Sequence, residues 1–308
     1  MNPEDLGALG GWLVKRAGVT TGLLGLAAVL ALVILAPGAG RAAPASAAPA
    51  QQAILTVFAA SSLTDAFKEI GINFEAEKNV SVTFSFGASS QLRTQLEQGA
   101  SADVFASADQ AQMDNARKAN VIDGADVTYA KNRLVMITPK NNPGQLMSAA
   151  DIARPGIKFV TAAPEVPVGV YTQNMFDTMS TIDVFGTDFQ DRANANTVSR
   201  EPNVRQVVAK VQLGEADAAV VYLTDVTPQS APDLLVIPIP DDLNTLASYP
   251  IAPVVNGPQA EIGKAFIDMV TGPSGQAVLK KWGFTTVSPT MLMPAPSTDR
   301  LALVQAGH

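Results

Sequence analysis

The 308-residue sequence contains no cysteine, and its only histidine is the final residue, His308. The lack of cysteine excludes disulfides, iron–sulfur clusters, cysteine nucleophiles and a lipid anchor on an N-terminal cysteine. Without a histidine inside the fold, Ser-His catalysis and histidine-ligated metal centres are not expected, since both need a positioned imidazole. Charged side chains make up only 16% of the residues and the formal net charge is −7, a balance that argues against a nucleic-acid-binding protein.

The first 50 residues have the pattern of an export signal. Lys15 and Arg16 precede an uncharged apolar run from Ala17 to Ala36, and a stretch rich in Ala and Pro follows. This pattern is typical of a signal peptide, and Ala45-Ser46-Ala47 fits a cleavage site. Because about 20 apolar residues can also span a bilayer, the segment 1–50 is either a cleaved signal peptide or an uncleaved signal anchor. Both alternatives place the rest of the chain outside the cytoplasmic membrane, since the basic flank stays inside.

The rest of the chain alternates short apolar runs with amphipathic segments. Strands are expected at residues 54–60, 80–86, 103–106, 134–137, 157–160, 218–222, 235–239 and 251–255, with helices between most of them and two helices after the last. This alternation predicts an α/β fold with a largely parallel sheet. Pro238 and Pro240 favour an edge strand or a crossover. Residues 291–308 lack periodicity and are expected to form a loose tail.

Four expected helix starts follow a strand or a tight turn and begin with small or polar residues. They are Ser61-Ser62, Ser89-Ser90, Val168-Gly169 and Asn203-Val204. Free N–H groups and the positive end of the helix dipole make such starts suited to an anion. Capping alone also explains each of them. The placement of the serine pairs directly after strands favours a ligand site at the C-terminal strand ends.

Local patterns at these helices predict further details. Ser62 and Asp65 have the spacing of a capping box, and Asn203 is expected to cap a helix that ends at Gly214. Arg205 is expected to be a solvated residue of the first turn.

The segments 56–67, 85–92 and 102–114 resemble the extracytoplasmic molybdate-binding proteins of ABC transporters. The resemblance continues in the segments 203–205, 214–225, 272–273 and 283–284, so that it covers about residues 54–285 with the motifs in the same order. It implies a two-lobed type II periplasmic-binding-protein fold with a ligand cleft between the lobes. Lobe one would take residues 51–133 and 238–290, and lobe two residues 134–237.

The same resemblance implies a molybdate or tungstate oxyanion held by neutral hydrogen-bond donors. Matched residue by residue, these donors are the hydroxyls of Ser62, Ser89 and Tyr222 and the backbone N–H groups of Val168 and Val204. Further candidate donors are Ser61, Ser90 and Gly169. No cofactor is expected, and a metal only as the oxyanion itself.

These features predict a binding protein and not an enzyme. It would act as a monomer and deliver the anion to the permease and ATPase subunits of an ABC transporter. Molybdate is fully deprotonated at pH 7 and only accepts hydrogen bonds, which suits hydroxyl and amide donors; tungstate is too similar to be ranked against it. A binding protein for sulfate or phosphate is an alternative. An exported serine hydrolase is disfavoured because no base is placed beside the serines, and an adhesion protein would not need the ordered motifs.

Overall fold

The computed structural model describes residues 52–287, in which strands and helices alternate, and this confirms the expected α/β class. All of these residues belong to one unit of the chain. The expected export signal at residues 1–50 and the expected tail at residues 291–308 lie outside the described residues. Within residues 52–287, no helix is both long and apolar enough to cross a membrane.

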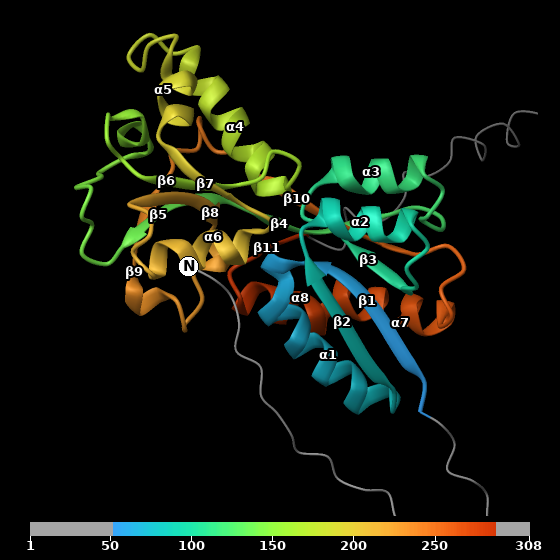
Figure 1. The fold of residues 1–308 in the computed structure, drawn as a ribbon. Helices are drawn as coiled ribbons and strands as arrows, with labels where there is room; N and C mark the ends of the chain where they lie inside the picture. The colour runs from blue at the N-terminus through green and yellow to red at the C-terminus, as the bar shows by residue number, and fades with distance from the viewer. Residues whose placement is uncertain (1–51, 288–308) are drawn as a thin grey trace, which may run out of the picture. The chain divides into compact units, whose positions relative to one another are not determined.

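The first half of the fold is built on a six-stranded sheet with the strand order β11-β4-β10-β3-β1-β2 (Figure 1). β1 runs parallel to β2 and β3, whereas β10 runs antiparallel to β3 and β4. The strands are β1 (Ile54–Ala60), β2 (Ser81–Gly87), β3 (Val104–Ala106), β4 (Val127–Asn132), β10 (Ala247–Pro253) and β11 (Thr285–Thr286). The helices are the 3-10 turn η1 (Ser61–Leu63), α1 (Thr64–Lys78), α2 (Ser89–Glu97), α3 (Gln110–Lys118), α7 (Ala260–Thr271) and α8 (Pro273–Lys281).

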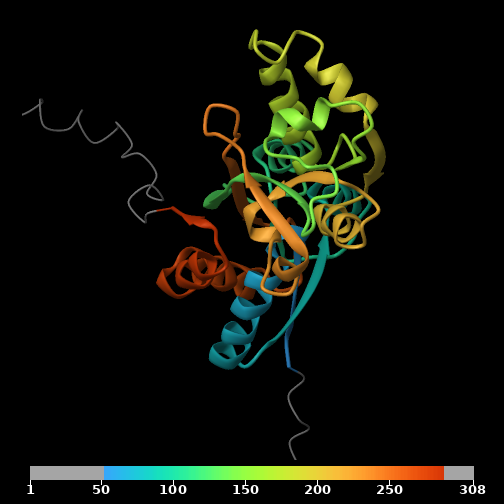
Figure 2. The ribbon, with the colours of Figure 1, turned by 90° about the vertical axis from the view of Figure 1, so that its left-hand side faces the viewer.

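Helices cover both faces of this sheet, because β1 is apolar at nearly every position. Leu55 and Val57 face a core that includes Phe67 of α1 and Phe266 of α7. Phe58 faces a second core formed with α2 and α3. Since successive side chains of a strand point to opposite faces, a continuous apolar run is buried on both sides. Figure 2 shows α1, α7 and α8 together on the side away from α4 and α5.

The second half is built on a five-stranded sheet with the strand order β7-β6-β8-β5-β9. β6 runs parallel to β7 and β8, and β5 runs antiparallel to β8 and β9. The strands are β5 (Leu134–Pro139), β6 (Phe159–Ala162), β7 (Thr197–Glu201), β8 (Ala218–Tyr222) and β9 (Leu234–Pro238). The helices are η2 (Ala149–Ala153), α4 (Pro167–Ser180), α5 (Phe189–Ala195), α6 (Val204–Gln212), η3 (Leu223–Asp225) and η4 (Ala231–Asp233). α6 covers one face, and α4 and α5 lie over the other (Figure 1).

The chain crosses between the halves twice. Arg133 alone separates β4 from β5, and residues 239–246 connect β9 to β10. The returning strand β10 enters the first sheet antiparallel between β3 and β4, so both sheets are mixed and the prediction of a largely parallel sheet is wrong. The edge position of β9 confirms the interpretation of Pro238, because an edge strand tolerates a residue without an N–H group.

Of the two helix caps predicted from the sequence, the one at Asn203 is confirmed and the one at Ser62 is wrong. Asn203 caps α6, since its Oδ1 accepts a hydrogen bond from the N–H of Gln206 at 3.2 Å, and Gly214 lies just beyond the helix with a φ of 71°. The predicted capping box of Ser62 and Asp65 is wrong. Ser62 lies inside η1 and its hydroxyl is bonded to Tyr249, while the Asp65 carboxylate accepts a bond from Arg205.

Arg205 joins the two halves and is not the solvated residue that the sequence predicts. Its Nη2 donates to Asp65 Oδ2 in α1 at 2.7 Å, and its Nε lies 3.2 Å from Oδ1 of the fully buried Asp225. Burial raises the pKa of the Asp225 carboxyl to about 6, although Arg205 and the N–H of Tyr222 oppose the rise. Arg205 therefore balances a buried carboxylate at the junction of the halves.

Replacing Arg205 with glutamine should lower the free energy of unfolding by up to about 3 kcal/mol at pH 8, because Asp225 would be left buried without a cation. The pKa of Asp225 is higher in the folded state than in the unfolded state, so protonation of Asp225 favours folding. The stability that it contributes is fully present below its unfolded pKa of about 4 and is lost as the pH rises through about 6. Arg205 limits that loss, so the penalty of Arg205→Gln should be smaller at pH 5 than at pH 8. Urea denaturation at both pH values measures it.

Arg133→Gln is the matched control for this experiment. Arg133 pairs with Asp241 on the surface, where both side chains are exposed, so its loss should cost less than about 1 kcal/mol. A penalty for Arg205→Gln that equals this control, or that does not change with pH, would contradict the assigned role.

Candidate functional site

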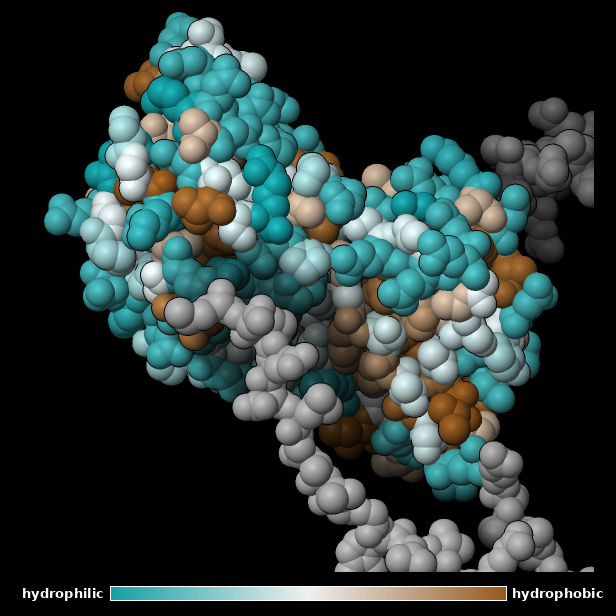
Figure 3. All heavy atoms as spheres, viewed as in Figure 1, coloured by the Kyte–Doolittle hydropathy of each residue, from teal (hydrophilic) through white to brown (hydrophobic). Residues whose placement is uncertain are grey.

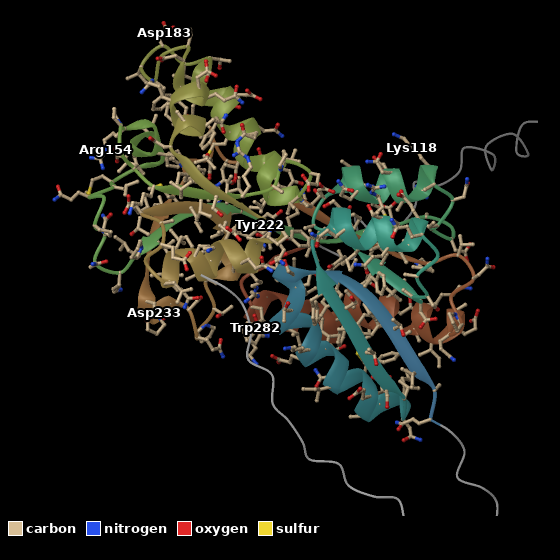
Figure 4. All side chains as sticks on the ribbon, in the orientation of Figure 1. Lys118, Arg154, Asp183, Tyr222, Asp233 and Trp282 are labelled. Atoms are coloured by element: carbon tan, nitrogen blue, oxygen red, sulfur yellow. The ribbon has the colours of Figure 1, made fainter. Side chains whose placement is uncertain are left out.

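One small cavity between the two halves is lined by all five residues expected to bind the anion. The volume open to the centre of a water-sized sphere is about 10 Å³, so the cavity is small. The lining residues are Ala60, Ser61, Ser62, Gly87, Ala88, Ser89, Ala108, Val166, Pro167, Val168, Val204 and Tyr222. Figure 4 shows Tyr222 near the middle of the molecule, where the two halves meet. The surface is indented between the part over α4 and the part over α3 (Figure 3).

The strand register of the first sheet brings its two serine motifs together. β1 and β2 are parallel neighbours, and their last residues Ala60 and Gly87 are directly paired. η1 therefore begins beside the turn that leads into α2, which places Ser62 and Ser89 at the same edge of the sheet. β3 ends at this edge as well, and Ala108 follows it.

The second sheet supplies the opposite wall in the same way. β6 runs parallel to β7 and β8, so the carboxyl ends of all three strands lie at one edge. α4 begins after β6, α6 begins after β7, and Tyr222 is the last residue of β8. α4 approaches β6 closely at Gly169, where an added Cβ would lie 2.3 Å from the carbonyl oxygen of Ala163. Only glycine fits this position without a shift of the backbone.

The hydroxyl groups of Ser62, Ser89 and Tyr222 differ in their partners. Ser89 Oγ accepts a hydrogen bond from the N–H of Ala108 at 3.0 Å, so its own proton is left to donate. Ser62 Oγ lies 2.9 Å from the hydroxyl oxygen of Tyr249. The hydroxyl of Tyr222 is buried and has no hydrogen-bond partner among residues 52–287. Burial also raises the pKa of Tyr222 well above its ordinary value, so the group stays protonated and can donate.

Backbone donors at two helix starts complete the lining. Val204 is the first residue of α6 and Val168 the second residue of α4. Their N–H groups have no acceptor in the described part of the chain, because Asn203 caps only the N–H of Gln206 in α6 and no side chain caps α4. Both helix dipoles place partial positive charge at these starts. The cavity can thus surround an anion with donors from both halves.

No charged side chain lines the cavity. Three acidic residues close in sequence to lining residues have partners outside the cavity: Asp65 and Asp225 pair with Arg205, and Asp109 caps α3 through the N–H of Gln112. Burial raises the pKa of Asp109 from its ordinary value. Within the described residues, no group of three or more His, Cys, Asp or Glu side chains is arranged to hold a bare metal ion. The site offers hydrogen-bond donors without a fixed charge.

The additional candidates from the sequence separate into two groups. Ser61 lines the cavity, whereas Ser90 and Gly169 do not. Sequence reasoning missed Tyr249, which contacts Ser62 from the distant strand β10, and Asn132, which contacts Tyr249. No local motif could have revealed either residue, because both contacts depend on how β10 returns to the first sheet.

Comparison with known proteins is consistent with this geometry. The family described as bacterial extracellular solute-binding protein matches residues 55–285. The molybdate-binding protein ModA of Mycobacterium tuberculosis is 37% identical over 273 residues, which are 88% of this chain and 99% of that protein. The ModA protein of Escherichia coli is 33% identical over 77% of this chain and 90% of its own length.

A solved structure shows the same fold at low sequence identity. The periplasmic molybdate-binding protein of Azotobacter vinelandii superposes with a TM-score of 0.65 at 19% identity, over 76% of this chain and all of that one. The family match and the identity to the mycobacterial protein show that this chain belongs to the bacterial extracellular solute-binding proteins.

Proposed function

We propose that the protein is the substrate-binding subunit of a molybdate transporter. It captures molybdate or tungstate outside the cytoplasmic membrane and delivers the anion, as a monomer, to the permease and ATPase subunits of an ABC transporter. The observation that carries the proposal is the cavity in which uncharged donors from both halves converge. The 37% identity to a protein named molybdate-binding protein supports the choice of anion.

The donors act as a set. Ser62 and Ser89 donate their hydroxyl protons from the first half, and Tyr222, Val168 and Val204 donate from the second. Ser61 is a further donor at the same wall. A fully deprotonated oxyanion accepts all of these bonds. A phosphate that keeps a proton would also have to donate a hydrogen bond, and no carboxylate lines the cavity to accept it. Sulfate has the right charge, so its exclusion depends on the size of the cavity.

We also propose that the two halves are lobes with the boundaries expected from the sequence, residues 51–133 with 238–290 and residues 134–237. Contacts besides the cavity also link them, among them the Arg205–Asp65 ion pair, a bond at 2.7 Å from Asn132 Nδ2 to Thr224 Oγ1, and a bond at 3.4 Å from Gln112 Nε2 to the carbonyl oxygen of Glu165. Because the donors come from both lobes, a closed arrangement gains contacts with the anion that an open one lacks.

Single donor substitutions should weaken molybdate binding by about tenfold to a hundredfold. A hydrogen bond to a charged partner contributes roughly 1.5–3 kcal/mol, and 1.4 kcal/mol is one decade of affinity. The variants are Ser62→Ala, Ser89→Ala and Tyr222→Phe, titrated with molybdate by calorimetry. Tyr222→Phe should leave the melting temperature nearly unchanged, since its hydroxyl has no partner within residues 52–287. Ser62→Ala should cost about 1 kcal/mol of stability through the lost bond to Tyr249.

Ser90→Ala is the matched control. Ser90 is the neighbour of Ser89 in α2, and its hydroxyl is buried but does not line the cavity. This variant should bind molybdate as the unmodified protein does. Unchanged affinity in all three donor variants, with lowered melting temperatures, would reject the proposed site.

Binding should also close the lobes. We expect the radius of gyration from small-angle X-ray scattering to fall when molybdate is added at a concentration at which calorimetry shows saturation. The Ser89→Ala/Tyr222→Phe double variant, which should bind too weakly to saturate there, should show no such decrease. A constant radius of gyration in the saturated protein would mean that the lobes do not move.

A further inference from the structure

A chain of three side chains leads from the junction of the halves to the cavity. Asn132 Nδ2 lies 3.3 Å from the hydroxyl oxygen of Tyr249, and that oxygen lies 2.9 Å from Ser62 Oγ. Asn132 is the last residue of β4, next to the crossing at Arg133, and Tyr249 lies in β10. All three side chains are buried, with exposed fractions of 1%, 0% and 3%. Water therefore has little access to this chain of bonds.

The direction of each hydrogen bond can be assigned by elimination. Asn132 Oδ1 accepts the N–H of Arg133 at 2.9 Å, which fixes the amide so that Nδ2 faces Tyr249 and Thr224. The amide is a donor, so the Tyr249 oxygen accepts from it. The Tyr249 proton then has only Ser62 Oγ as a partner within residues 52–287. Ser62 accepts that bond, and its own proton is left for the cavity.

We propose that Asn132 and Tyr249 are positioning residues that fix the Ser62 hydroxyl as a donor to the anion. This inference rests on the proposed function, because it concerns how one of the proposed donors is oriented. A serine hydroxyl has three staggered positions, and it can present either its proton or a lone pair to a neighbour. Because Ser62 Oγ accepts the bond from Tyr249, its hydroxyl proton points into the cavity in the arrangement in which every bond of the chain is made. Burial raises the pKa of Tyr249 well above its ordinary value, so the chain keeps its protons at physiological pH.

Ser89 shows the same arrangement with a backbone donor. Its Oγ accepts from the N–H of Ala108, which again leaves the hydroxyl proton for the cavity. Both serines are thus oriented by a donor behind them, one from the main chain and one through two side chains. Hydroxyls that are oriented before the anion arrives do not have to lose rotational freedom on binding.

Tyr249→Phe tests this inference through its coupling to Ser62. In the unmodified background, the substitution should weaken molybdate affinity by about threefold to tenfold, because the Ser62 hydroxyl loses its fixed direction and its polarising partner. In the Ser62→Ala background, it should cause no further loss. Tyr129→Phe is the matched control, since Tyr129 is also fully buried in the first half, and its hydroxyl has no partner in the described residues and does not line the cavity.

Asn132→Asp provides a second test that does not depend on how Tyr249→Phe folds. The carboxylate still accepts the N–H of Arg133, but it also accepts a hydrogen bond from the Tyr249 hydroxyl, where the amide donated one. The Tyr249 oxygen then accepts from Ser62, and the lone pairs of Ser62 face the anion. Affinity at pH 8 should fall more than tenfold, and the loss should be markedly smaller in the Ser62→Ala background. Melting curves without anion show whether each variant is folded.

Two outcomes would overturn the inference. One is a Tyr249→Phe effect no larger than that of Tyr129→Phe; the other is a loss from Tyr249→Phe or Asn132→Asp that is the same with and without Ser62. If Ser62→Ala still weakens binding in these cases, only the positioning role fails. If the unmodified protein does not bind molybdate at all, the proposed function itself fails.

Discussion

The proposed site depends on one requirement: a small anion must be surrounded by hydrogen-bond donors without a cation beside it. Taking an ion out of water is costly unless each of its oxygens finds a new partner. The described residues meet this requirement with parallel strands, because parallel neighbours end at the same edge and the helices that follow begin there. The pairing of Ala60 with Gly87 in the first sheet, and of β6 with β7 and β8 in the second, brings the donors to one cavity.

The charged side chains lie outside the lining of the cavity. The protein carries a net charge of −7, which repels anions at long range but is screened beyond about 8–10 Å at physiological salt. In the sequence neighbourhood of the lining residues, Arg205 pairs with Asp65 and Asp225 and offsets part of their negative charge. The Arg205–Asp65 pair also links α6 of the second half with α1 of the first. The residue that offsets these acidic charges therefore also connects the two halves.

The positions of the candidate donors can be predicted from the sequence because each lies at an expected strand end or helix start and in a segment that resembles the family. Ser62, Ser89, Val168, Val204 and Tyr222 all lie at a strand end or a helix start, and the structure places all five in the lining of one cavity. Their roles as ligands remain a prediction. The serine pair in the sequence does not tell which of its two members lines the cavity: Ser89 does, and Ser90 does not.

The contacts behind the donors could not be predicted from local patterns. Tyr249 is 187 residues from Ser62, and Arg205 is 140 residues from Asp65. Both contacts depend on the two crossings between the halves, which also place β10 antiparallel in the first sheet. The pattern of β4 gave no clear strand signal, because it mixes the buried Tyr129 and Ala130 with half-buried polar residues. Without β4 and β10 in place, neither Asn132 nor Tyr249 can be related to the site.

The most direct test of this account is the position of a heavy oxyanion in a crystal of the protein grown with tungstate. Anomalous scattering locates the tungsten atom independently of any assumption about its ligands. We expect one strong peak in the cavity, with tungstate oxygens within hydrogen-bond distance of the hydroxyls of Ser62, Ser89 and Tyr222 and of the N–H groups of Val168 and Val204. A peak only at another place on the protein, or an empty cavity in crystals grown at saturating tungstate, would contradict the account.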